Sequence, residues 1–149
     1  MNSQKGQSMF ELVVAIAICA LIIVAIVSLT TNSIRNSSYS KNKTLAATYA
    51  QQATEWLRGQ RDSGIDAFIT NVMAKTDSKR CLNNLNWLTI ASCPSGSTIT
   101  GTPFQRDVIF TIGGDAETVM YADITVSWSD SAGLHQITSA TSFSDWRQR

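Results

Sequence analysis

Apolar residues follow two different patterns in the first 64 positions of the chain. From Leu12 to Val27 every residue is apolar, so a helix over this run is hydrophobic on all sides. Further on, apolar residues recur every three or four positions, which predicts an amphipathic helix with one buried face. The residues in this second pattern are Leu45, Ala46, Tyr49, Ala50, Ala53, Trp56 and Leu57.

The two patterns are joined by a polar stretch that nothing interrupts. Residues Ser28 to Thr44 are rich in Ser, Thr and Asn, which are weak helix formers, but no Pro or Gly occurs from Gln7 to Arg58. We therefore predict one helix with a soft middle, from about Ser8 to about Arg61, on the order of 80 Å long at 1.5 Å per residue. Gly64 is expected to mark its stop.

The last third of the chain alternates apolar and polar residues with the period of a β-strand. Alternation over Val108–Ile112 and over Ala122–Trp128 predicts two strands, and Leu134–Phe143 a third, more polar one. Turn residues separate them at Gly113–Asp115 and Ser129–Gly133. The expected result is an antiparallel meander whose one apolar face lies against the amphipathic half of the helix.

Between the helix and the strands lies a segment with two of the three cysteines. Ile65–Ala74 predicts a short helix, and Lys75–Pro103 an irregular polar segment that carries Cys81 and Cys93. Cys19 lies in the apolar run, so only the other two are placed to meet. Outside the cytoplasm they would form a disulfide worth about 2 to 3 kcal/mol. The alternative is two free thiols in a cytosolic protein.

Composition and motifs exclude several functions. The chain has 12 basic and 11 acidic residues, a formal charge of +1, and no basic cluster typical of a nucleic-acid-binding surface. His135 is the single histidine, and its predicted strand favours a surface or edge position over catalysis. No phosphate-binding, dinucleotide-binding or zinc-protease motif occurs, and no acidic pair has the ligand spacing of a calcium loop. We predict no enzyme activity, no cofactor and no metal.

The most specific feature is Glu11, a single acid at the head of the apolar run. An acid inside a membrane costs roughly 2.5 kcal/mol or more, so it calls for a partner. A simpler interpretation is a capping box, in which Ser8 and Glu11 bond the first free N–H groups of the helix. The run itself is longer than the apolar core of a signal peptide, and no small-x-small cleavage site follows it. A retained membrane anchor is therefore predicted.

Residues Lys5–Glu11 resemble the type IV prepilin signal. A short leader with a basic residue ends in Gly6, a hydroxyl residue follows closely, and Glu11 is fifth in the chain that begins at Gln7. The resemblance implies the pilin fold, an α+β arrangement of a long amino-terminal helix and an antiparallel sheet. Two further features narrow the resemblance: Val126–Trp128 precede a turn, and no Pro occurs before Pro94. With these features the chain is most similar to a minor pilin of the pilus-modification group or a minor pseudopilin.

The resemblance also implies roles for individual residues. A membrane-bound prepilin peptidase would cut after Gly6 on the cytoplasmic face and methylate the new amino terminus at Gln7. Gln7 departs from the family, in which an aromatic residue or Met is commonest there. Glu11 would accept the charged terminus of a neighbouring subunit and so set its axial register. Other implied partners are further pilin subunits through the amino-terminal helix, the inner-membrane assembly platform and, before assembly, membrane lipid.

The expected organisation has five parts: residues 1–6 as leader, 7–29 as the transmembrane and assembly half of the helix, 30–64 as its second half, 65–103 as a variable loop with a disulfide, and 104–149 as sheet and tail. The protein would span the inner membrane once, with its carboxy-terminal domain outside, and then join a surface pilus or periplasmic pseudopilus. Two alternatives are a minor pseudopilin of a type II secretion or DNA-uptake system and a membrane-tethered extracytoplasmic binding domain.

Overall fold

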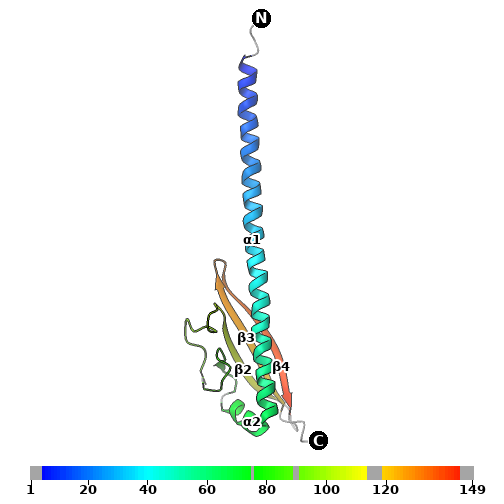
Figure 1. Cartoon of the computed structure of the whole chain (residues 1–149), viewed down its shortest axis with the longest axis vertical. Coiled ribbons are helices and arrows are strands. Elements are labelled where there is room, and N and C mark those ends of the chain that lie inside the picture. The colour runs from blue at the N-terminus through cyan, green and yellow to red at the C-terminus, as the bar shows by residue number, and fades with distance from the viewer. Residues whose placement is uncertain (1–4, 75, 89–90, 114–118, 145–149) are drawn as a thin grey trace. The chain divides into compact units, whose positions relative to one another are not determined.

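The computed structural model describes residues 5–74, 76–88, 91–113 and 119–144, with the backbone alone at residues 5–8. The chain divides into two compact units, Met1–Asn42 and Lys43–Arg149. The fold is α+β, as predicted. Its elements in chain order are α1 (Lys5–Ser63), α2 (Ile65–Met73), β1 (Lys79–Cys81), β2 (Gln105–Gly113), β3 (Val119–Asp130) and β4 (Gly133–Ser144) (Figure 1).

The long helix is continuous through the polar stretch that joins its two halves. Helix α1 runs without a break over 59 residues, which confirms the predicted single helix. The Thr30 hydroxyl donates a hydrogen bond to the carbonyl oxygen of Ile26, 2.9 Å away, and the Thr48 hydroxyl bonds the carbonyl of Thr44 in the same way. Such bonds one turn back satisfy polar side chains within the helix itself.

The end of α1 is close to its predicted position. The helix ends at Ser63, near the predicted Arg61, and Gly64 follows it as the expected stop. The backbone of Gly64 is extended, with φ −179° and ψ 95°, so helical geometry ends there. Gly64 also begins the next helix, because its carbonyl oxygen accepts the backbone N–H of Phe68 at 2.9 Å.

The four strands form one antiparallel sheet in the order β1-β2-β3-β4. The predicted meander is confirmed by the pairing of β2, β3 and β4. The prediction of a wholly irregular segment over Lys75–Pro103 is wrong, because Lys79–Cys81 forms β1 and pairs with β2. Three residues are too few to show a period of two, so the sequence pattern carried no signal for this strand. Of the turn predicted at Gly113–Asp115, Gly114 and Asp115 lie outside the described residues.

The core lies between the second half of α1 and one face of the sheet (Figure 1). Four α1 residues spaced three or four apart are at most 1% exposed: Ala46, Ala50, Ala53 and Leu57. Three of the four are alanine, so the helix backbone can lie close to the strands. The strand residues facing them are also buried, namely Val108, Phe110, Met120, Ala122, Ile124, Val126, Trp128 and Phe143.

Candidate processing and assembly segment

The predicted processing residues lie in the first turns of α1. Gly6 and Gln7 have helical backbone, but the side chains of residues 5–8 are outside the described part, so cleavage and methylation stay predictions. The helix begins at Lys5, which places Ser8 inside it. In the uncut chain Ser8 is therefore not at the N-cap, and the capping-box interpretation does not apply to this form of the protein.

Glu11 lies on α1 among exposed apolar side chains. Its neighbours Phe10 and Leu12 are 73% and 61% exposed, and no further charged residue occurs before Arg35. Among the residues whose side chains are described, none forms an ion pair or hydrogen bond with Glu11. A carboxylate in apolar surroundings is stable only with a cation or donor beside it.

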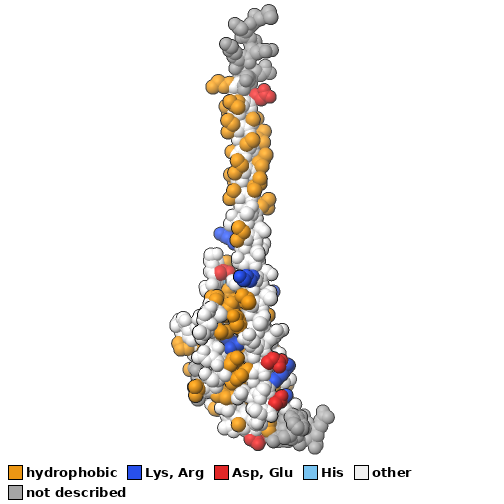
Figure 2. Space-filling model, viewed as in Figure 1, with side chains coloured by type: hydrophobic (Ala, Val, Ile, Leu, Met, Phe, Trp, Pro, Cys, Tyr) orange, Lys and Arg blue, Asp and Glu red, His pale blue; other side chains and the backbone are white. Residues whose placement is uncertain are grey.

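The apolar run gives α1 the character of a membrane helix. Among the described helices, this one is long and apolar enough to cross a bilayer, by length and composition alone. Its most apolar window has a mean hydropathy of 3.3, and none of that window is buried inside the molecule. Figure 2 shows apolar side chains projecting along this stretch. Lipid or other apolar helices are the surroundings that such a surface requires.

A disulfide joins Cys81 at the end of β1 to Cys93 in the following loop, with their Cα atoms 4.5 Å apart. The loop is also held by the Cys93 backbone N–H, which donates to Oδ1 of Asp107 at 3.0 Å. Cys81, Cys93 and Asp107 lie close enough together to suggest metal ligands. Because both sulfurs are in the disulfide, neither is a thiolate available to a metal.

A buried arginine that the sequence analysis did not single out fixes this loop to the helix. Arg106 is 1% exposed and donates to three carbonyl oxygens: Leu82 at 3.0 Å, Tyr49 at 2.7 Å and Asn83 at 3.2 Å. Burial lowers the pKa of Arg106 to about 10, so the guanidinium is still charged at neutral pH. These bonds connect α1, β2 and the loop after β1 through one side chain.

A second buried arginine is the middle residue of β1. Arg80 is 1% exposed, and its guanidinium carbon lies 5.4 Å from the ring centre of Trp87 and 5.8 Å from that of Phe110. Burial lowers the pKa of Arg80. The Trp87 indole N–H donates to Oε1 of Gln60 on α1 at 2.9 Å. Trp87 therefore packs locally between the loop and the helix.

The single histidine stands at the end of the β3–β4 hairpin. His135 stacks on Trp128 with ring centres 5.3 Å apart, and its Nε2 lies 2.9 Å from Oδ1 of Asp130. The hydrogen bond from His135, followed by that from the Ala132 backbone N–H, lowers the pKa of Asp130. The place of His135 on edge strand β4 agrees with the predicted surface or edge position.

Comparison with known proteins gives one match. The family model described as the prokaryotic N-terminal methylation motif matches residues 1–27. Neither the curated proteins nor the solved structures contain a match to the chain. The motif, together with the long apolar helix and the antiparallel sheet, defines a type IV pilin-like protein. The predicted resemblance at this level is confirmed.

The motif carries consequences for processing and location. The motif is typical of substrates of prepilin peptidase, and it implies assembly with other pilins. Proteins with this motif are structural subunits. Together with the apolar helix it fits an inner-membrane-anchored pilin. Gly6, Gln7 and Glu11 all lie within the matched residues.

Proposed function

We propose that this chain is a minor pilin of a type IV pilus, cut after Gly6, methylated at Gln7 and built into the filament in low copy. The observation that carries the proposal is the position of Glu11 inside the matched motif, among exposed apolar side chains. The leader is residues 1–6, residues 7–29 act in the membrane and in assembly, and residues 30–149 form the rest of the helix and the domain outside the cytoplasm.

The proposed chemistry of assembly rests on one charge pair. A free α-amino group has a pKa near 8, so the amino terminus at Gln7 would be positive at neutral pH, with or without a methyl group. In an apolar helix bundle an unpaired carboxylate or ammonium costs several kcal/mol, and pairing the two removes much of that cost. A neighbouring subunit in the wrong axial register would leave both charges unpaired. Glu11 thereby selects the register.

The first test is mass spectrometry of the amino-terminal peptide from membranes of cells that make the protein. We expect a chain that begins at Gln7 and carries one added methyl group. A chain that still begins upstream of Gly6, in cells with an active prepilin peptidase, would overturn the proposal and favour a membrane-tethered binding domain.

A matched pair of variants tests the assembly role. We expect Glu11→Gln to abolish recovery of the chain in sheared filaments while leaving it processed and in the membrane. Asp62→Asn is the control, because Asp62 is an exposed residue of the same helix that pairs with Arg61. Equal recovery of both variants would contradict the role of Glu11. Filaments that remain in the periplasm would identify a pseudopilin in place of a pilus subunit.

A further inference from the structure

The two edges of the sheet are built differently. Strand β1 forms one edge with only three residues, Lys79–Cys81, and is tied down by the disulfide. The Cys81 backbone N–H donates to the carbonyl oxygen of Ala91 at 2.7 Å, so the loop covers part of this edge. Short length, a lysine and a covering loop are the means by which proteins protect a strand edge from pairing with another chain.

Strand β4 forms the opposite edge and, among the described residues, has none of these protections. It is 12 residues long, Gly133–Ser144, and contains no Lys, Arg, Asp, Glu or Pro. Among the described strands it pairs with β3 alone. A long, uncharged edge presents a row of backbone donors and acceptors to which an extended peptide can add as a further strand.

The register identifies the backbone groups at this open edge. The β3–β4 hairpin closes on the Asp130–Gly133 pair, and the residues that flank a two-residue turn form a hydrogen-bonded pair. Bonded and non-bonded pairs then alternate along an antiparallel ladder. Counting from the turn, the even-numbered residues of β4, among them Thr138, Ala140 and Ser142, direct their N–H and C=O groups outward.

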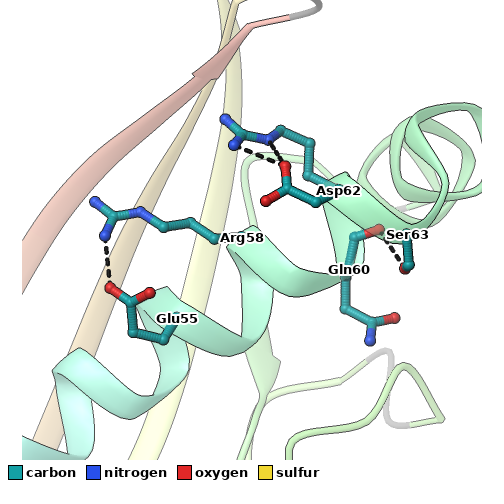
Figure 3. Close-up of polar contacts among 6 residues, drawn as sticks. Glu55, Arg58, Gln60, Asp62 and Ser63 are labelled. Carbon is teal, nitrogen blue, oxygen red and sulfur yellow. Dashed lines mark hydrogen bonds and ion pairs between the residues drawn. The ribbon is translucent and has the colours of Figure 1, made fainter.

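A groove beside this edge would hold the side chains of an added strand. Its volume is about 400 Å³, and it is lined by Gln51, Thr54, Glu55 and Arg58 from α1 and by Ser139, Ala140 and Thr141 from β4. Glu55 and Arg58 form an ion pair on one face of α1 (Figure 3). The lining is therefore neutral overall and rich in hydroxyl and amide groups, which favours small uncharged side chains over charged ones.

The direction of α1 argues against a second β4 as the added strand. Antiparallel pairing of β4 with its own copy would place a two-fold axis between them, and the partner's α1 would then run in the opposite direction. Subunits anchored in one membrane and built into one polar filament share a direction. Antiparallel pairing with a second β4 therefore does not fit such a filament, which favours a different segment of the neighbour.

We propose that the open edge of β4 receives an extended, uncharged segment of a neighbouring pilin-like subunit by strand addition. This inference rests on the proposed function, since the filament brings the neighbour to this edge. The backbone of β4 would supply the hydrogen bonds, and the groove would select side chains that are small and neutral. The contact lies in the domain and is separate from the charge pair at Glu11.

The test places a photocrosslinking amino acid at Thr138 of the full chain in cells that make filaments. We expect a crosslink to an extended segment of a second pilin-like chain, located by mass spectrometry of the linked peptides. Ala140→Pro, which removes one outward N–H, and Ser142→Lys, which adds an edge charge, should each abolish the link. Tyr121→Lys is the control: it adds the same charge to the paired, 48% exposed residue of β3.

The outcomes separate the two proposals. If the chain is recovered in filaments but Thr138 links only to lipid, to helices or to its own chain, the strand addition is wrong. The same holds if the link survives both Ala140→Pro and Ser142→Lys. If the chain is processed but never recovered in filaments, the proposed function fails, and this inference fails with it.

Discussion

The two halves of α1 differ in whether their apolar side chains are buried within the molecule. Leu57, in the second half, is 0% exposed because the sheet covers it, whereas Leu21, in the first half, is 71% exposed. Both are leucines in one unbroken helix, so helical backbone does not determine where an apolar side chain is buried. The second half finds its apolar surroundings within the molecule, and the first half requires them from a membrane or other subunits.

The two halves also differ in how apolar residues are distributed and in their size. In the second half the buried stripe contains Ala46, Ala50 and Ala53, small residues that match the close approach of a sheet. In the first half, large residues such as Ile16 and Ile22 lie on all sides. A stripe specifies one partner surface in one orientation, whereas an apolar cylinder accepts contacts all round it.

The largest expected effect comes from truncating the same residue type in each half. Leu57→Ala should destabilise the domain by about 2 to 5 kcal/mol, because it removes buried methyl groups and leaves a cavity. Leu21→Ala should change domain stability by less than about 0.5 kcal/mol, since its side chain is exposed. Urea denaturation of the full chain in detergent, followed by tryptophan fluorescence, measures both. Similar midpoints for the two variants would refute the contrast.

Cysteines give a second matched comparison. Replacing Cys81 and Cys93 by Ser removes the cross-link between β1 and its loop, and should cost about 3 kcal/mol or somewhat less of domain stability. Cys19→Ser changes a free, exposed cysteine in the first half and should leave the denaturation midpoint where it was. The same comparison in reducing buffer is a control, because reductant should lower the wild-type midpoint to that of the double variant.

Periodicity predicts both halves of α1 and three strands, but it fails where length or polarity hides the pattern. Strand β1 is too short to show alternation. Arg106 lies two residues before Val108 in β2, so strand alternation places both side chains on the inward face. A charged residue at that position does not match the apolar pattern expected of a buried face, so the sequence does not reveal its burial. Its bond to the Tyr49 carbonyl joins residues 57 apart in the chain, a contact that follows only from the completed fold.

The candidate site shows a different limit. Gly6, Gln7 and Glu11 were found from their spacing, because a peptidase reads a short linear signal. Their proposed roles concern a peptidase and a neighbouring subunit, so the fold of one chain does not test them. The open edge of β4 was not found from sequence. It requires the strand order and the absence of charge along β4 to be known together.

The smallest expected effect compares two acids, one in each region. The bonds from His135 and Ala132 lower the pKa of Asp130 below the ordinary 3.8, so the folded state favours the carboxylate. Asp130 therefore adds stability above pH 3.8, and this contribution is lost as the pH falls through the lowered pKa. In Asp130→Asn the midpoint temperature of thermal unfolding should therefore fall less steeply as the pH is lowered. The difference should be slight, because the carboxylate is exposed and screened by solvent.

Glu11→Gln is the control for this acid limb. Glu11 lies outside the domain unit, so its loss should leave the pH profile of domain unfolding unchanged. Thermal midpoints from pH 2 to pH 6, on the order of ten points per variant, resolve the slope that a single carboxylate produces. If Glu11→Gln shifted the profile as much as Asp130→Asn, the amino-terminal segment and the domain would be thermodynamically coupled. The prediction that the amino-terminal segment does not contribute to domain unfolding would then be wrong.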